Sequence, residues 1–272
     1  MIEIVAPGPL ATVQDAGRPG YAALGVPRSG AFDRAALALA NRLVGNGEDA
    51  AGVEITYGGL RVRCLVPLTV ALTGAPCPGA PDWGTPVTLP AGAEVRLGPP
   101  PAGVRSYLAV RGGIAVPPVL GSRSTDTLSG LGPALLAAGD RLPVGVPAGP
   151  VSGASAAGRS APERLPAVFG PRDDWFAPSA RELLGSAQWV VRAESDRVGI
   201  RLAGPALERV RPGELPSEPV LPGAVQVPPD GRPIVFGPDA PVTGGYPVIA
   251  VVPDVSLLAQ LRPGDVVRFR PR

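Results

Sequence analysis

The chain has 272 residues, a formal net charge of +2 and 45% apolar residues, enough for one large domain or two modest ones with a sizeable core. The basic residues are scattered and nearly balanced by acidic ones, which argues against a nucleic-acid-binding surface. All 25 basic residues are Arg, so triads that need His, Schiff bases and P-loops that need Lys, and covalently attached biotin are excluded on this chain.

The predicted elements are short. With 37 Gly and 37 Pro, the chain favours brief strands joined by tight turns, and the fold class predicted is mainly β with a few short helices. Apolar or alternating runs predict strands at 60–66, 68–73, 104–110, 189–193 and 234–236. Helical periodicity predicts helices at 31–44, 179–184 and 255–261. We expect Ser29 or Gly30 to cap the first of these helices.

One short pattern recurs three times. Leu, two further residues and Gly precede a short strand at 89–92, 136–139 and 261–264. Glycine adopts positive φ at little cost, so each repeat predicts a tight turn leading into a strand of a curved sheet.

A linker is predicted between two parts of the chain. Residues 146–162 are rich in Gly, Ala, Ser and Pro and nearly free of large apolar side chains. They would separate an N-terminal subdomain, 1–145, from a C-terminal subdomain, 163–272. A long surface loop within one architecture is the alternative.

The sequence predicts no metal site and no membrane segment. Cys64 and Cys77 lack CxxC spacing and His partners, and two reduced thiols are favoured over a disulfide. No signal peptide is evident, and the apolar runs are too short to span a bilayer, so we expect a cytoplasmic protein.

Three segments carry polar residues that could bind or transform a ligand. The first, 13–33, places Gln14, Asp15 and Arg18 among glycines; the simpler interpretation is that Asp15 pairs with Arg18. The second, 121–127, holds four hydroxyls and one Arg and could form an anion-binding nest or a hydrated turn. The third combines 194–199 with 226–230 and 239–247, where carboxylates could act as acids or bases or simply pair with Arg.

Ten motifs in the order expected of one family extend these segments over nearly the whole chain. They include VQDAGRPGY, GVPRSGAFD, LGSRSTDTL, ESDRVGIRL, QVPPDGRPI and TGGYPVI. On these motifs the chain resembles the KipA-type family, also called allophanate hydrolase subunit 2 or biotin-dependent carboxyltransferase, whose members serve as the C-type subunit of prokaryotic 5-oxoprolinase.

The resemblance implies a cyclophilin-like β-barrel architecture with two subdomains. It implies two partners, a KipI-type subunit and a LamB/YcsF-type subunit, in a complex that converts 5-oxo-L-proline to L-glutamate with ATP and Mg. Carried over to matching positions, it implies catalytic roles for Asp196, Arg197 and Asp239. Residues expected to bind substrate or anions are Arg18, Tyr21, Ser29, Asp33, Ser122, Arg123, Ser124, Thr125, Gln226 and Tyr246.

Departures from the family pattern concern the substrate more than the fold. Val198 and Ile200 replace Met and Tyr, Pro241-Val242 replaces Gln-Thr, and the segment 129–133 lacks an Arg. Two alternative functions therefore stay open. One is a carboxyltransferase of urea-amidolyase type, using carboxybiotin supplied by another protein; the other is a non-catalytic regulator of a KipI-type kinase inhibitor.

Overall fold

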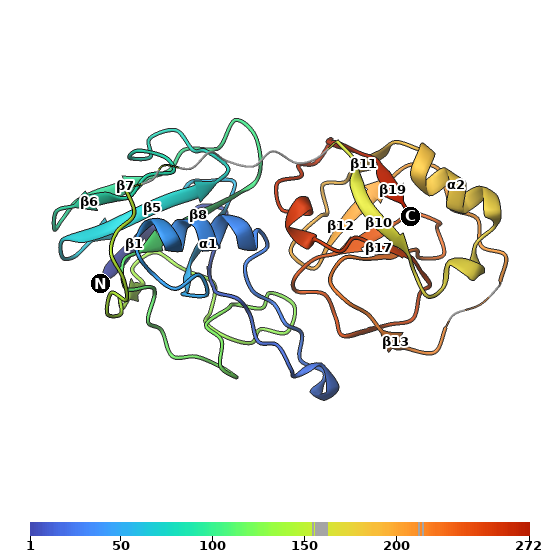
Figure 1. The fold of residues 1–272 in the computed structure, drawn as a ribbon, viewed down its shortest axis with the longest axis horizontal. Coiled ribbons are helices and arrows are strands. Elements are labelled where there is room, and N and C mark those ends of the chain that lie inside the picture. The colour runs from blue at the N-terminus through green and yellow to red at the C-terminus, as the bar shows by residue number, and fades with distance from the viewer. Residues whose placement is uncertain (154, 156–162, 212, 214) are drawn as a thin grey trace. The chain divides into compact units, whose positions relative to one another are not determined.

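A computed structural model describes residues 1–153, 155, 163–211, 213 and 215–272. The chain forms two compact units (Figure 1). Unit 1 contains Met1–Arg18, Ser29–Asp126 and the described residues from 130 to 155; unit 2 contains Pro19–Arg28, Thr127–Ser129 and the described residues from 163 onward. The predicted linker at 146–162 stays a prediction, because positions 154 and 156–162 lie outside the described residues.

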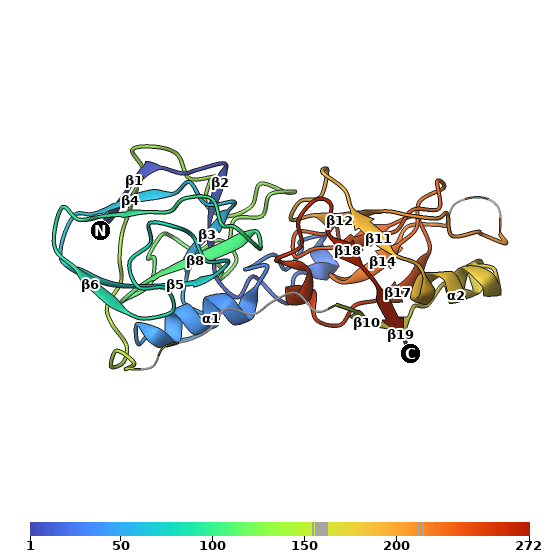
Figure 2. The ribbon, with the colours of Figure 1, turned by 90° about the horizontal axis from the view of Figure 1, so that it is seen from above.

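Unit 1 is built from two antiparallel sheets. The five-stranded sheet has the order β2 (Leu10–Gln14), β3 (Gly52–Thr56), β8 (Arg105–Val110), β5 (Leu68–Gly74) and β6 (Val87–Leu89). The four-stranded sheet has the order β7 (Glu94–Arg96), β4 (Arg61–Cys64), β1 (Ile2–Ala6) and β9 (Arg141–Leu142). Ile4, Val62, Ile55 and Leu108 belong to the apolar core of this unit. Figure 2 shows the two sheets as separate layers.

Helix α1 (Arg34–Leu43) covers the other face of the five-stranded sheet. Strand β8 is buried along its whole length because successive side chains point to opposite faces, and both faces are covered. Leu108 and Val110 pack in the core of the two sheets, whereas Ala109 packs with Ala40 and Leu43 of the helix. The small residues on the helix side let α1 lie close to the strands.

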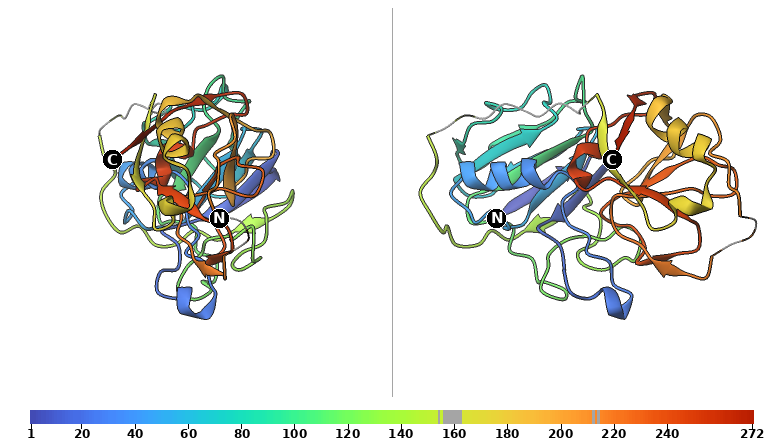
Figure 3. Two further views of the ribbon diagram at one scale, coloured as in Figure 1. Left: turned by 90° about the vertical axis from the view of Figure 1, so that its right-hand side faces the viewer. Right: turned by 45° about the vertical axis from the view of Figure 1, so that its right-hand side comes forward.

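Unit 2 is a nearly closed barrel (Figure 3). Its eight-stranded sheet has the order β18 (Val266–Val267), β11 (Trp189–Val191), β12 (Gly199–Ala203), β15 (Ile234–Phe236), β14 (Ala224–Gln226), β17 (Val248–Val251), β10 (Leu165–Phe169) and β19 (Phe269–Pro271). Only β10 and β19 pair in parallel within this described sheet. Helix α2 (Pro178–Ser186) packs beside β19. The small pair β13 (Glu218–Pro219) and β16 (Thr243–Gly244) stands apart from the barrel sheet.

The prediction of a mainly β fold with a few short helices and a barrel is confirmed, but the first helix begins later than expected. It starts at Arg34, and its N-cap is Asp33, whose carboxylate accepts a hydrogen bond from the Ala36 N–H at 3.0 Å. The predicted caps were therefore wrong. Ser29 has φ +53° and Gly30 has φ +98°, conformations that cannot begin a right-handed helix.

The other described helical segments are short 3-10 helices. The helix predicted at 255–261 is the 3-10 helix η3 (Val255–Leu258), capped by Asp254, and two further 3-10 helices are η1 (Ala22–Leu24) and η2 (Asp173–Trp175). Among the described residues, no helix combines the length and apolarity needed to cross a membrane. Cys64 and Cys77 are free and buried, and burial raises the pKa of both thiols.

The recurring Gly turns are confirmed. Gly92, Gly139 and Gly264 have φ of +83°, +93° and +91°, and each precedes a strand: β7, β9 and β18. A Cβ atom at any of the three would meet nothing within 4 Å. Glycine is therefore required at these turns by the backbone conformation and not by a close neighbour.

Candidate functional site

A buried carboxylate organises the hydroxyl-rich segment of unit 1. Asp15, directly after β2, accepts hydrogen bonds from Ser122 Oγ at 2.6 Å and Ser124 Oγ at 2.5 Å, and from the Arg123 N–H at 2.5 Å. It also accepts from the Gly17 N–H at 2.8 Å. The two Ser protons are thus donated to Asp15, so the charge of this carboxylate shapes the segment 122–124 from within.

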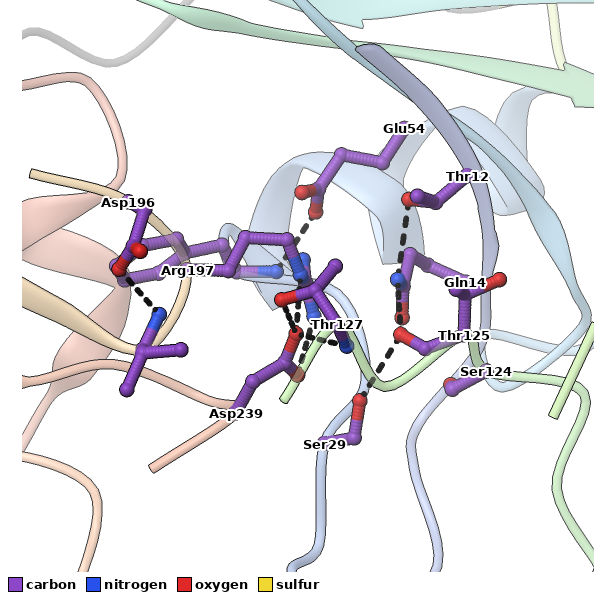
Figure 4. Close-up of polar contacts among 12 residues, drawn as sticks. Thr12, Gln14, Ser29, Glu54, Ser124, Thr125, Thr127, Asp196, Arg197 and Asp239 are labelled. Atoms are coloured by element: carbon purple, nitrogen blue, oxygen red, sulfur yellow. Dashed lines mark hydrogen bonds and ion pairs between the residues drawn. The ribbon is translucent and has the colours of Figure 1, made fainter. Parts of the chain in front are cut away.

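Two polar side chains beside Asp15 hold the same stretch of backbone. Gln14 Nε2 donates to the Thr125 carbonyl at 2.8 Å and to Thr12 Oγ1 at 3.0 Å (Figure 4). The Arg18 guanidinium donates through Nη2 to the Ser124 carbonyl. Arg18 is 1% exposed and does not form the predicted ion pair with Asp15. The predicted set Arg18, Ser122, Arg123, Ser124 and Thr125 therefore comes together in one unit.

The segment around Ser29 packs on the same region. Ser29 Oγ donates to the Thr125 carbonyl at 3.2 Å, and the Ala31 N–H donates to the Asp15 carbonyl at 3.0 Å. A Cβ atom at Gly30 would lie 3.0 Å from the backbone of Ala16. This contact, together with its positive φ, explains a glycine at position 30.

Asp33 belongs to a neighbouring buried network below α1. Its N–H donates to Tyr107 Oη at 2.7 Å, and Tyr107 Oη donates to Glu54 Oε2 at 2.8 Å. Burial, followed by the Glu54 charge, raises the pKa of Tyr107 well above its ordinary value, which keeps the phenol protonated as a donor. Asp33 thus caps the helix within a rigid network; its predicted role in binding stays a prediction.

In unit 2 a buried ion pair joins two of the predicted catalytic residues. Arg197 Nε and Nη2 donate to the two carboxylate oxygens of Asp239 at 2.8 and 2.9 Å, with side-chain exposures of 2% and 0% (Figure 4). Thr127 donates to Asp239 Oδ2 through its N–H at 2.9 Å and its hydroxyl at 2.8 Å. These charge-assisted hydrogen bonds tie the loops that carry Thr127, Arg197 and Asp239 to one another.

Of the other predicted residues of unit 2, Asp196 and Gln226 hydrogen-bond to the backbone. Asp196 is exposed, and its carboxylate accepts from the Val198 and Gly199 N–H groups at 2.8 and 3.0 Å, which closes a local turn. Gln226 Nε2 donates to the Tyr246 carbonyl at 3.0 Å. Tyr21 precedes η1 and is half-buried. The catalytic and binding roles of these residues remain predictions.

Gln14 and Thr127 lie in candidate segments that the sequence indicated, 13–33 and 121–127, but neither was given a binding or catalytic role. Glu54 lies in an apolar run outside these segments, and nothing in its local pattern indicated the site. Gly132 was also missed: a Cβ there would lie 2.0 Å from the Ser124 carbonyl oxygen and 3.0 Å from Arg18 Nη2. Within the described residues, no group of three or more His, Cys, Asp or Glu is placed to hold a metal ion.

Comparisons with known proteins agree with this arrangement of motifs. Residues 24–271 match the family described as carboxyltransferase domain, subdomain A and B. The chain belongs to this carboxyltransferase family. The C-type subunit of 5-oxoprolinase from Escherichia coli strain K12 is 41% identical over 280 residues, which cover 99% of this chain and 90% of the relative.

Two solved structures share the fold of this chain over 99% of its length. The structure titled TTHA0988 in space group P212121 has a TM-score of 0.88 at 40% identity, and the Kluyveromyces lactis urea amidolyase has 0.91 at 29%. This chain covers 55% of the first structure's chain and 18% of the second. It therefore corresponds to about half of one longer protein and to a smaller part of a multidomain one.

Proposed function

We propose that this carboxyltransferase-family chain is one subunit of an ATP-dependent 5-oxoprolinase, which converts 5-oxo-L-proline to L-glutamate. The observation that carries the proposal is the 41% identity to the C-type 5-oxoprolinase subunit of Escherichia coli, across 99% of this chain and 90% of that relative. Agreement over nearly the full length of a stand-alone protein supports a shared role more strongly than a match to one part of a multidomain protein. The corresponding 5-oxoprolinase subunit from Haemophilus influenzae is 33% identical with the same coverage.

The chain would act with a KipI-type subunit and a LamB/YcsF-type subunit in the cytoplasm. The overall reaction consumes two waters: one is added across the lactam C–N bond, which breaks to give the amine and the new carboxylate of glutamate, and one is consumed as ATP becomes ADP and phosphate. ATP with Mg is proposed as a substrate of the whole complex, and the contacts described for this chain assign no step to it. The chain's own contribution is a preorganised set of Arg, amide and hydroxyl groups that can neutralise and orient an amide-containing anion.

Asp196, Arg197 and Asp239 remain proposed catalytic positions. Their geometry favours different roles. The Arg197–Asp239 pair holds its charges in place and is better suited to orienting neighbouring groups than to exchanging a proton. The exposed Asp196 keeps one oxygen engaged with the backbone of 198–199.

The test is reconstitution. The chain is purified together with its KipI-type and LamB/YcsF-type partners, and glutamate release from 5-oxo-L-proline plus ATP is measured with each of the three proteins omitted in turn. We expect release from the full set and none when this chain is absent. Glutamate release that is unchanged without this chain would contradict the proposal.

A carboxyltransferase function is the second candidate. It is favoured by the family description and by the TM-score of 0.91 to the Kluyveromyces lactis urea amidolyase. The chain has no Lys, so biotin would arrive on a separate protein. Transfer of labelled carboxylate from a biotinylated partner to an amide, with no glutamate release, would establish this candidate. Binding to a KipI-type partner with neither reaction would favour the regulatory alternative.

A further inference from the structure

Arg18 in unit 1 is a buried arginine that has no carboxylate partner among the described residues. Three arginines are buried in the described part of the chain: Arg18, Arg105 and Arg197. Arg105 lies 3.6 Å from the Glu54 carboxylate and Arg197 pairs with Asp239, whereas Arg18 forms no ion pair with any described carboxylate. Burying a guanidinium is unfavourable unless its charge and its N–H groups are matched, and the described residues supply no carboxylate that matches Arg18.

The buried polar atoms around Arg18 that lack hydrogen-bond partners indicate which chemical groups a bound ligand would need. The Arg18 Nε and Nη1 atoms are buried and have no hydrogen-bond partner among the described residues. Two nearby buried atoms, Gln14 Oε1 and Thr125 Oγ1, likewise find no partner there; their side chains are 0% and 4% exposed. Gln14 and Arg18 donate to the adjacent carbonyls of Thr125 and Ser124, so all three side chains belong to one small cluster, the Arg18 cluster.

The orientation of the Gln14 amide determines that its Oε1 needs a hydrogen-bond donor from a ligand. Its Nε2 must face the Thr125 carbonyl, because that oxygen can only accept, and this leaves Oε1 as an acceptor that needs an N–H or O–H. A bare phosphate would offer mainly acceptors to Oε1 at neutral pH. A molecule with a carboxylate beside an amide N–H matches both the guanidinium and the Gln14 oxygen, and the Thr125 hydroxyl can serve either group.

We infer that the Arg18 cluster binds the carboxylate and the ring N–H of a carboxylated lactam, with Arg18 on the carboxylate and Gln14 Oε1 on the N–H. The identity of that ligand as 5-oxo-L-proline rests on the proposed function; the complementarity to a carboxylate next to an amide N–H does not. Arg18 and Thr125 then act as substrate-binding residues, and Asp15 positions the segment 122–125 that they contact.

Two valine substitutions separate binding from structure. Thr125→Val removes a buried hydroxyl that has no hydrogen-bond partner within the described part of the chain, so it should not lower the melting temperature. Thr73→Val is the matched control: Thr73 is 3% exposed, and its hydroxyl donates to the Ala36 carbonyl at 2.7 Å. The control should lower the melting temperature and leave ligand affinity unchanged. Arg18→Lys keeps the charge but loses the guanidinium geometry.

The experiment measures binding of 5-oxo-L-proline to the assembled complex without ATP, by calorimetry, so that turnover is not required. We expect Thr125→Val and Arg18→Lys to raise Kd about tenfold or more, the loss typical of a hydrogen bond to a charged or buried partner. 2-Pyrrolidinone, which lacks the carboxylate, should bind weakly and equally to all variants. In turnover, the KM for 5-oxo-L-proline should rise while the KM for ATP stays constant.

Wild-type affinity in both variants, or no measurable binding of 5-oxo-L-proline to the wild-type complex, would overturn the inference and make the cluster purely structural. The proposed function would still stand if that complex released glutamate. Conversely, Arg18-dependent binding in a complex that releases no glutamate would support the site and refute the 5-oxoprolinase assignment. Tighter binding of biocytin than of 5-oxo-L-proline would contradict the lactam as ligand.

Discussion

Asp15 determines the conformation of the hydroxyl-rich segment. Ser122 and Ser124 could have formed an anion nest with their hydroxyls facing outward, and the sequence alone leaves that choice open. In the structure both hydroxyls donate to Asp15, so a carboxylate that follows β2 takes the place that an external anion would occupy. The pattern SRST could predict a polar turn, but not which carboxylate it surrounds, because the partner is 107 residues away.

Replacing Asp15 should therefore loosen this whole segment. We expect Asp15→Asn to lower the free energy of unfolding by about 3 kcal/mol, since the neutral amide weakens several charge-assisted bonds and turns one acceptor into a donor. Urea denaturation of the full chain measures the change. Asp49→Asn, at an exposed position, is the control and should change stability by less than about 0.5 kcal/mol. Equal effects from the two substitutions would refute the role of Asp15.

The ion pairs of Glu94 should contribute a part of the folding free energy that is lost at acidic pH. Hydrogen bonds from Arg63 and then from Arg61 lower the pKa of Glu94 from 4.5 to about 2. Because the folded pKa is below the unfolded one, the stabilisation is present above about pH 4.5 and is lost as the pH falls towards 2. Thermal unfolding between about pH 5 and about pH 2.5 should show a smaller decline for Glu94→Gln than for the wild type. Parallel declines in the two proteins would contradict this assignment, with Glu48→Gln, in an exposed ion pair, as the control.

At the scale of elements, turn chemistry was more predictable than helix capping. The three Leu-x-x-Gly repeats predicted turns correctly because positive φ is a property of the glycine itself. The start of α1 was placed too early because Ser29, Gly30 and Asp33 are all acceptable caps locally. The choice among them came from packing: the segment 29–31 is held against the backbone of 15–17, and the helix begins only after it.

Gly92 provides a clean measure of turn strain. We expect Gly92→Ala to destabilise the chain by about 1–2 kcal/mol, because an L-residue is strained at φ +83° although its Cβ would meet no atom within 4 Å. Gly153→Ala, where no positive φ applies and space is open, should be neutral or slightly stabilising. Thermal unfolding distinguishes the two variants. A neutral Gly92→Ala would show that the turn relaxes without cost.

At the scale of the whole molecule, the motifs predicted the family and the fold class, which depend on many positions at once. They did not separate binding residues from structural ones. Arg18 and Arg197 look alike in sequence, as arginines that follow an aspartate closely in a glycine-containing loop, yet Arg197 is matched by Asp239 and Arg18 is matched by no described carboxylate. That difference depends on contacts between distant segments, which local pattern cannot supply.

The most direct test of the 5-oxoprolinase assignment is the ratio of glutamate to phosphate released by the complex assembled with and without this chain. The account predicts one glutamate for each phosphate in the presence of 5-oxo-L-proline when all subunits are present, and loss of glutamate when this chain is omitted. Phosphate release without glutamate from the fully assembled and folded complex, or glutamate release that does not depend on this chain, would contradict it.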